Sequence, residues 1–84
     1  MNFVFSKHAL EQMKLRNISK NVVEKILSNP EQIKNEQGKK VYQSVADDGK
    51  YLIRIFVNHY KNPKVIITVY KTSKITKYYE SKIW

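Results

Sequence analysis

The spacing of the apolar residues changes near Gln32, and this change constrains the fold more than any other feature of the sequence. Before Gln32, apolar residues recur every three or four positions, as on the buried face of a helix. After it, apolar and polar residues alternate, as on strands that are buried on one side. The sequence therefore predicts helices first and a sheet afterwards, an α+β arrangement.

Two serines mark the starts of the predicted helices. Ser6 can cap a helix over residues 7–16, because its side chain can accept a hydrogen bond from the first turn. Ser19 can cap a second helix over residues 20–28 in the same way. The short apolar segment Phe3–Phe5, which precedes the first cap, is either an edge strand or an extended lead-in.

The strand signal is concentrated in three later segments, residues 40–46, 51–60 and 65–71, with a weaker alternation around Ile33. Turn residues separate these segments, which indicates hairpin connections. We expect two N-terminal helices packed on a twisted antiparallel β-sheet of three to four strands. One domain is expected over residues 1–84. Its end, residues 75–84, is a possible docking tail that forms a last strand, packs on the core or awaits a partner.

Composition excludes several classes of site. The 84 residues include no cysteine, so disulfides and thiolate metal ligands are excluded and a cytoplasmic location is the simplest expectation. Two histidines without clustered carboxylates predict no metal site, and two glycines cannot build a phosphate-binding loop. We expect no cofactor. The longest apolar runs are interrupted by Arg54 and Thr68, so no membrane segment is expected.

The charge of the chain favours an anionic partner. Sixteen Lys and Arg against seven Asp and Glu give a formal net charge of +9. Residues 39–84 carry ten of the basic residues and three of the acidic ones. RNA, DNA and acidic proteins all suit such a field, and RNA is the partner we expect. The alternative is the Lys, Asn and Ile bias of an AT-rich genome, which has no functional meaning.

His8, Gln12 and Arg16 share one face of the first predicted helix, because residues four apart are neighbours there. The pair His8 and Arg16 spans about 12 Å along the axis, enough to flank a phosphodiester and its neighbour. A solvated helix face shows the same spacing. The pattern alone leaves both interpretations open.

Arg54 interrupts the most apolar predicted strand and shares a face with Leu52 and Phe56. A guanidinium in the middle of a sheet must pair with a carboxylate, reach an edge or bind an anion, because an unpaired buried charge is costly. Carboxylates are scarce in this part of the chain, with Glu36 and Glu80 among the few. An anion-binding role is therefore open beside carboxylate pairing.

Hydroxyl groups and lysines alternate at the end of the last predicted strand. Thr68, Tyr70 and Thr72 share one face, and Lys71 and Lys74 lie close by. Such side chains can bind phosphate oxygens and offer a ring for base stacking. A run of strand-forming residues with solvated lysines would have the same sequence.

Two segments carry a resemblance to a known family. Residues 5–19 read FSKHALEQMKLRNIS, and residues 68–74 read TVYKTSK. With Tyr51, Leu52, Arg54 and Val57, they resemble a family of small bacterial domains of uncharacterised function. That family is grouped with the barnase, EndoU, colicin and RelE type of fold, which includes RelE/ParE-like toxins. The resemblance covers nearly all of residues 3–74.

The resemblance implies a toxin-like, metal-independent endoribonuclease. In such enzymes the ribose 2′-hydroxyl attacks the adjacent phosphate. Its catalytic residues would be His8, Arg54, Tyr70 and Thr68. Its RNA-binding residues would be Arg16, Lys71, Thr72 and Lys74. A neutralising antitoxin or immunity protein is then an expected partner.

Two other functions agree with the same residues. The alternatives are a nucleic-acid-binding module without catalysis and a toxin that acts on a protein target such as gyrase, because a fold does not fix a function. Loss of His8 would be tolerated by binding through charge alone. It would not be tolerated by catalysis.

Overall fold

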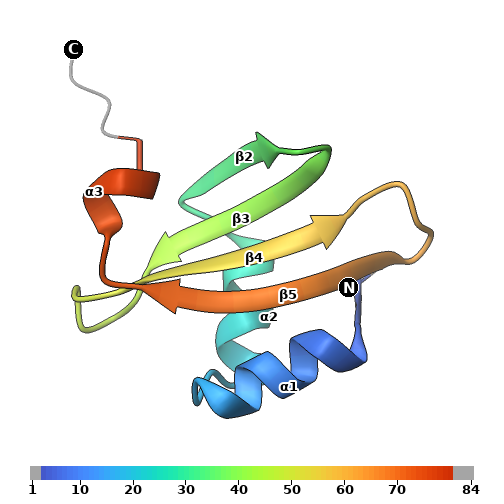
Figure 1. Cartoon of the computed structure of the whole chain (residues 1–84), viewed down its shortest axis with the longest axis horizontal. Helices are drawn as coiled ribbons and strands as arrows, with labels where there is room; N and C mark the ends of the chain where they lie inside the picture. Colours follow the sequence, from blue (N-terminus) through green and yellow to red (C-terminus); the bar gives the residue numbers. More distant parts are fainter. Residues whose placement is uncertain (1–2, 81–84) are drawn as a thin grey trace.

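One mixed sheet of five strands and three short helices make up the part of the chain that the computed structural model describes, residues 3–80 (Figure 1). The chain runs through β1 (Phe3–Phe5), α1 (Lys7–Leu15), α2 (Lys20–Ser28), β2 (Gln32–Glu36), β3 (Lys39–Val45), β4 (Leu52–Asn58), β5 (Lys64–Thr72) and α3 (Ile75–Tyr78). The strands lie in the order β1-β5-β4-β3-β2. β4, the most apolar predicted strand, therefore has two strands on each side.

The expectation of two helices on an antiparallel sheet of three to four strands was wrong. Within residues 3–80 the sheet has five strands and is mixed, since β1 pairs with β5 in parallel while every other pair is antiparallel. A third helix, α3, follows the last strand. The fold prediction must be corrected on all three points.

The two strands that the prediction undercounted are weak in sequence for physical reasons. β1 has three residues, and a parallel pair joins segments far apart in the chain, so no turn residue signals it. β2 reads QIKNE and lies at the edge of the sheet. None of its residues is fully buried, so its sequence carries little of the apolar alternation that marks a strand. Pairing with β5 and β3, rather than intrinsic preference, makes these segments strands.

The helix starts lie where the serines predict them. The Oγ of Ser6 accepts a hydrogen bond from the backbone N of Ala9 at 3.0 Å, and the Oγ of Ser19 accepts one from Val22 N at 3.2 Å. Ser6 Oγ also donates to the carbonyl of Ile67 at 2.9 Å. That bond fixes the start of α1 against β5.

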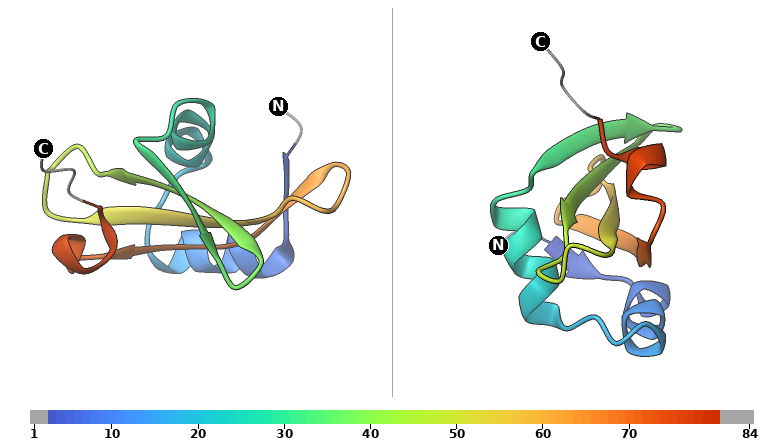
Figure 2. Two further views of the ribbon diagram at one scale, coloured as in Figure 1. Left: turned by 90° about the horizontal axis from the view of Figure 1, so that it is seen from above. Right: turned by 90° about the vertical axis from the view of Figure 1, so that its left-hand side faces the viewer.

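The apolar core lies on one side of the sheet, which we call the core face. Ala9 and Met13 from α1, and Val23, Ile26 and Leu27 from α2, pack there against buried sheet residues. α3 lies on the opposite side of the strands from α2, and we call that side the α3 face (Figure 2). None of the helices within residues 3–80 is long and apolar enough to span a membrane.

Candidate functional site

The two faces of β4 differ in chemistry. Ile53 and Ile55 belong to the apolar core, whereas Arg54 points to the α3 face and is only 1% exposed. The antiparallel register places Gln43 of β3 and Tyr70 of β5 directly opposite Arg54. A row of polar side chains therefore crosses the three central strands.

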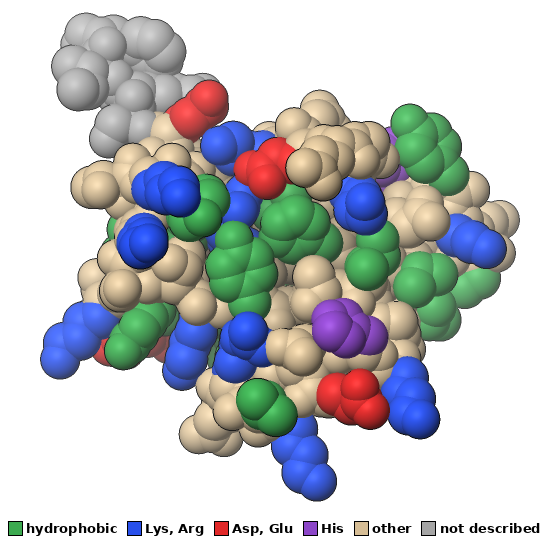
Figure 3. All heavy atoms as spheres, viewed as in Figure 1, with side chains coloured by type: hydrophobic (Ala, Val, Ile, Leu, Met, Phe, Trp, Pro, Cys, Tyr) green, Lys and Arg blue, Asp and Glu red, His purple; other side chains and the backbone are tan. Residues whose placement is uncertain are grey.

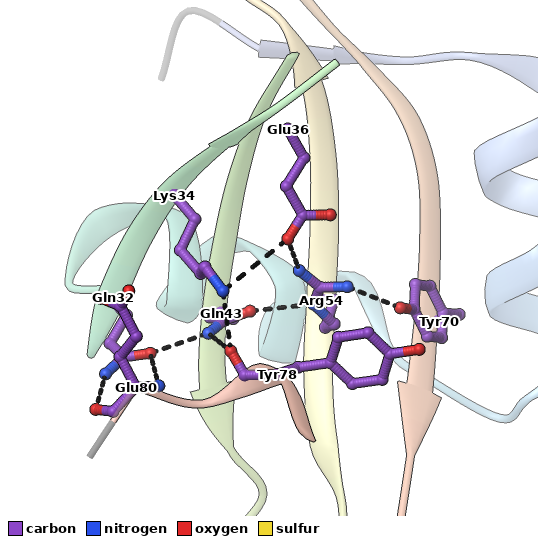
Figure 4. A network of polar contacts seen from close by, with 8 residues as sticks. All are labelled: Gln32, Lys34, Glu36, Gln43, Arg54, Tyr70, Tyr78 and Glu80. Atoms are coloured by element: carbon purple, nitrogen blue, oxygen red, sulfur yellow. Dashed lines mark hydrogen bonds and ion pairs between the residues drawn. The ribbon is translucent and has the colours of Figure 1, made fainter. Parts of the chain in front are cut away.

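The guanidinium of Arg54 is held by three side chains (Figure 4). Its Nε donates to Gln43 Oε1 at 2.9 Å, and its Nη1 donates to the hydroxyl oxygen of Tyr70 at 2.8 Å. Its Nη2 donates to the carboxylate of Glu36, with which it also forms an ion pair. Pairing with a carboxylate is thus the arrangement that the structure adopts for this buried arginine.

Glu36 reaches Arg54 from the end of β2. The following turn has positive φ at Gln37 (52°) and Gly38 (76°), which returns the chain into β3. The Glu36 side chain is 32% exposed, and Lys34 Nζ lies 3.9 Å from its Oε2. One carboxylate is therefore shared by a buried and a solvated cation, and it remains accessible from solvent.

α3 covers one side of this cluster. The ring centroid of Tyr78 lies 4.4 Å from the guanidinium carbon of Arg54, in cation–π range. The Tyr78 carbonyl accepts hydrogen bonds from Gln43 Nε2 at 3.1 Å and from Lys34 Nζ at 3.2 Å. These bonds attach α3 to the sheet directly above Arg54.

Residues 79 and 80 extend the attachment. Gln32 Nε2 donates to the carbonyl of Glu80 at 2.6 Å, and the Glu80 N donates back to Gln32 Oε1 at 3.1 Å. Burial raises the pKa of the Tyr79 hydroxyl above its ordinary value of 10.0, and the charge and hydrogen bonding of Glu31 raise it further. Of the expected docking tail, residues 75–80 pack on the chain's own sheet, while residues 81–84 lie outside the described residues.

A hollow of about 420 Å³ opens beside the cluster. It is lined by Glu36, Gln37, Lys39, Arg54, Phe56, Ile67, Thr68, Tyr70 and Tyr78. On this side of the molecule, hydrophobic side chains gather over the middle of the surface and Lys and Arg side chains border them (Figure 3). The hollow therefore combines a carboxylate, cations, hydroxyls and aromatic rings.

The structure brings together three of the predicted catalytic residues and separates the fourth. Arg54, Thr68 and Tyr70 all line the hollow. His8 is exposed on α1, and it does not line the hollow as residues 3–80 define it. A catalytic role for His8 therefore stays a prediction, made for a residue outside this hollow.

The predicted RNA-binding residues are spread over both faces. Thr72 continues the row of Thr68 and Tyr70 along β5, and its Oγ1 accepts a hydrogen bond from the Lys74 N at 3.0 Å. Lys71 turns to the other face, where its Nζ lies 5.2 Å from the ring centroid of Tyr51. Arg16 bonds the side chain of Gln12, one helical turn earlier.

The sequence interpretation gave no role to Gln43, placed Tyr78 only in the possible docking tail, and treated Glu36 only as a possible partner of Arg54. Gln43 pairs with Arg54 because Ala46 N donates to the carbonyl of Tyr51 across a loop of residues 47–50. A loop shorter by one residue would pair Gln43 with Ile53 instead, so the pairing depends on a loop length that the turn residues alone do not fix. The contact of Tyr78 depends on how the chain turns after β5, which no local pattern specifies. No cluster of three metal-ligating side chains occurs among the described residues.

Two strands that line the hollow, β4 and β5, lie in a long part of the sequence whose charged residues are all basic. From Gly49 to Tyr79 the chain contains no Asp or Glu. Its cationic residues are Lys50, Arg54, Lys61, Lys64, Lys71, Lys74 and Lys77. Glu36, which enters from β2, is the acidic residue among those that line the hollow within residues 3–80.

Comparison with known proteins identifies one family. Residues 5–71 match the family described as Domain of unknown function (DUF4258). No curated protein and no solved structure matches the chain. Nothing in these comparisons links it to RelE-like or barnase-like toxins. The matched segment ends one residue before the end of β5, so α3 lies beyond it. The match covers most of the sequence, and the chain belongs to the DUF4258 family.

Proposed function

We propose that this domain is an endoribonuclease that cleaves RNA without a metal ion, at the hollow around Glu36 and Tyr70. One observation carries the proposal: a single buried guanidinium orients a carboxylate and a phenolic hydroxyl at a strongly basic surface. A general base, a general acid and cations are the groups that attack by a 2′-hydroxyl requires.

The roles follow from exposure and hydrogen bonding. The Glu36 carboxylate would accept the proton of the 2′-hydroxyl as the bond from O2′ to phosphorus forms. The bond from phosphorus to O5′ breaks, and the Tyr70 hydroxyl would donate its proton to that oxygen. The products are a 2′,3′-cyclic phosphate and a free 5′-hydroxyl. Tyr70 regains a proton from solvent and Glu36 releases one, which completes the cycle.

Cations that reach solvent would bind the phosphate. Lys39 lines the hollow, and the Lys34 side chain is 25% exposed beside Glu36. Thr68 is the hydroxyl next to Tyr70 along the same face. Thr72 and Lys74 lie between the end of β5 and the start of α3 and would contact the RNA backbone.

Arg54 receives a different role from the one expected from the sequence. Its three nitrogens are bonded to protein side chains and it is 1% exposed, so it does not present itself to a phosphate. It is a positioning residue that fixes Glu36 and Tyr70 relative to each other. His8 receives no part in proton transfer, because it does not line the hollow.

Binding of nucleic acid without cleavage is the second candidate. It is favoured by the ring of Tyr78, which lies over Arg54 and closes one side of the cluster. In that case the Arg54 cluster would only attach α3 to the sheet. The toxin resemblance adds the proposal that a neutralising protein covers the basic surface, through acidic groups complementary to it.

Cleavage of end-labelled RNA in EDTA tests the proposal. The wild type should produce fragments with cyclic phosphate ends, and Glu36→Gln should reduce the rate about 10²- to 10⁴-fold, the usual contribution of a general base. Glu24→Gln is the matched control, because it removes the same charge from an exposed site on α2 and should cleave normally.

Two results would reject this reaction. Equal cleavage by Glu36→Gln and the wild type would remove Glu36 from the chemistry. RNA that is bound but left intact by the wild type would support the binding module instead.

A further inference from the structure

The most exposed aromatic side chain within residues 3–80 lies at the tip of the β4–β5 hairpin. Tyr60 is 80% exposed, the same fraction as Leu15 on α1. Single exposed apolar residues are common and mean little by themselves. Tyr60 differs from Leu15 in how it is held and in the charge around it.

The ring of Tyr60 is held in place by its neighbours. Its centroid lies 4.2 Å from that of His59, with an angle of 33° between the ring planes. Its backbone N donates to Asn58 Oδ1 at 3.1 Å, which fixes the start of the turn. His59 Nδ1 is buried and has no hydrogen-bond partner among the described residues, so this nitrogen does not hold the His59 ring in place. The Tyr60 ring is tilted against His59 on one side and remains largely in solvent.

The hairpin tip is also purely basic. Lys61 lies in the turn and Lys64 begins β5, and the nearest acidic residues in sequence are Asp48 and Glu80. An exposed ring between lysines suits a strand of nucleic acid, whose bases stack on rings and whose phosphates pair with ammonium groups. An acidic peptide would use the lysines but would have no need of the ring.

We propose that the β4–β5 hairpin tip is a second RNA contact, at which an unpaired base stacks on Tyr60 while Lys61 and Lys64 contact the adjacent phosphates. The contact selects single-stranded RNA, because a paired base cannot leave its stack without cost. β5 links the tip to the hollow: Lys64 and Tyr70 are six residues apart, about 20 Å along a strand. The register shift between Phe56 and Val57 places Lys64 on the face of Ile66 and not on that of Tyr70, so the tip is a contact separate from the hollow. This inference rests on the RNA-binding part of the proposed function and not on cleavage.

Fluorescence anisotropy with labelled oligouridine RNA, in EDTA and at two salt concentrations, tests the contact. Tyr60→Ala should weaken binding about tenfold, which is about 1.4 kcal/mol, because one base loses the ring on which it stacks. Tyr60→Phe keeps the ring and should bind like the wild type. Leu15→Ala is the matched control, since it removes an equally exposed apolar side chain from α1. Lys61→Gln and Lys64→Gln should each lower the slope of binding against salt by about one.

The outcomes separate this inference from the proposed function. Unchanged affinity of Tyr60→Ala for single-stranded RNA would overturn the hairpin contact and leave the hollow untouched. Equal weakening for single-stranded and duplex RNA would also overturn it, because stacking requires an unpaired base. Binding retained by Glu36→Gln without cleavage supports the proposed chemistry. No binding by the wild type would overturn both.

Discussion

The two faces of β4 are both buried, yet they are built differently. On the core face, Ile55 is fully buried among other aliphatic side chains, and any residue of similar volume and polarity would serve there. On the α3 face, Arg54 is just as inaccessible but requires Gln43, Tyr70 and Glu36 at defined positions. Packing on the core face thus depends on the volume of the side chains, whereas packing on the α3 face depends on specific hydrogen-bond and ion-pair partners.

This difference shows that the α3 face contains polar groups that the stability of the fold does not require. A buried ion pair contributes little net stability compared with a well-packed apolar cluster, because both charges must be removed from water. A chain selected only for stability would gain by continuing the apolar pattern of β4 on its second face. The polar row instead leaves a carboxylate and a hydroxyl oriented beside an open hollow, which is the arrangement that our functional proposal uses.

The largest effect on stability is expected on the core face. Ile55→Ala removes buried methyl and methylene groups and leaves a cavity, so it should reduce the free energy of unfolding by about 2–5 kcal/mol. Urea denaturation followed by circular dichroism measures it. A loss below 1 kcal/mol would mean that the core face is loosely packed, and the contrast between the two faces would disappear.

A smaller loss is expected from Arg54→Met. Methionine has a similar length, but Gln43 and Tyr70 lose a hydrogen-bond partner and Glu36 loses its buried cation. Because Glu36 is partly solvated, we expect about 2 kcal/mol rather than the larger loss of a fully buried pair. The same denaturation experiment measures it. A more stable variant would show that the row opposes folding, which would sharpen the contrast.

Tyr70→Phe should cost about 1 kcal/mol, because it removes one neutral hydroxyl that accepts a hydrogen bond from Arg54. Its effect on RNA cleavage should be far larger, since the proposal uses this hydroxyl as the proton donor. Stability and cleavage rate measured on one preparation give both numbers. Normal cleavage by Tyr70→Phe would transfer the acid role to another group.

The smallest expected effect is the change of stability with pH that Tyr79, the residue after α3, contributes. The pKa of Tyr79 is raised in the folded state, so its contribution to stability is present below its ordinary pKa of 10.0. That contribution is lost as the pH rises through the folded-state pKa. Ultraviolet titration of the wild type and Tyr79→Phe should show one tyrosine that ionises late, and only in the wild type. If no tyrosine of the wild type ionises late, the Tyr79 hydroxyl is exposed to solvent and does not interact with Glu31.

Much of the local structure could be predicted from the sequence. Both helix starts follow from Ser6 and Ser19, because a capping hydroxyl is a local signal. The number and direction of the strands could not be predicted, because β1 becomes a strand only by pairing with β5, about 60 residues later. The third helix has four residues, too few for any periodicity to appear.

The candidate site could be predicted only in part. Arg54, Thr68 and Tyr70 come from strands with a clear period of two, so their shared face follows from counting. Glu36 lies on a weakly patterned edge strand, and its contact with Arg54 depends on sheet order. His8 was grouped with these residues by resemblance, and helix α1 holds it outside the hollow.

The most direct test of the central claim compares cleavage and stability in Glu36→Gln. The claim is that the α3 face holds Glu36 for chemistry and not for folding. We predict that its cleavage rate falls at least about 100-fold while the protein stays folded, with the free energy of unfolding reduced by about 2 kcal/mol because buried Arg54 loses its counter-charge but keeps a hydrogen-bond acceptor. Unchanged cleavage, or a loss of cleavage that merely follows a loss of folded protein, would contradict the claim.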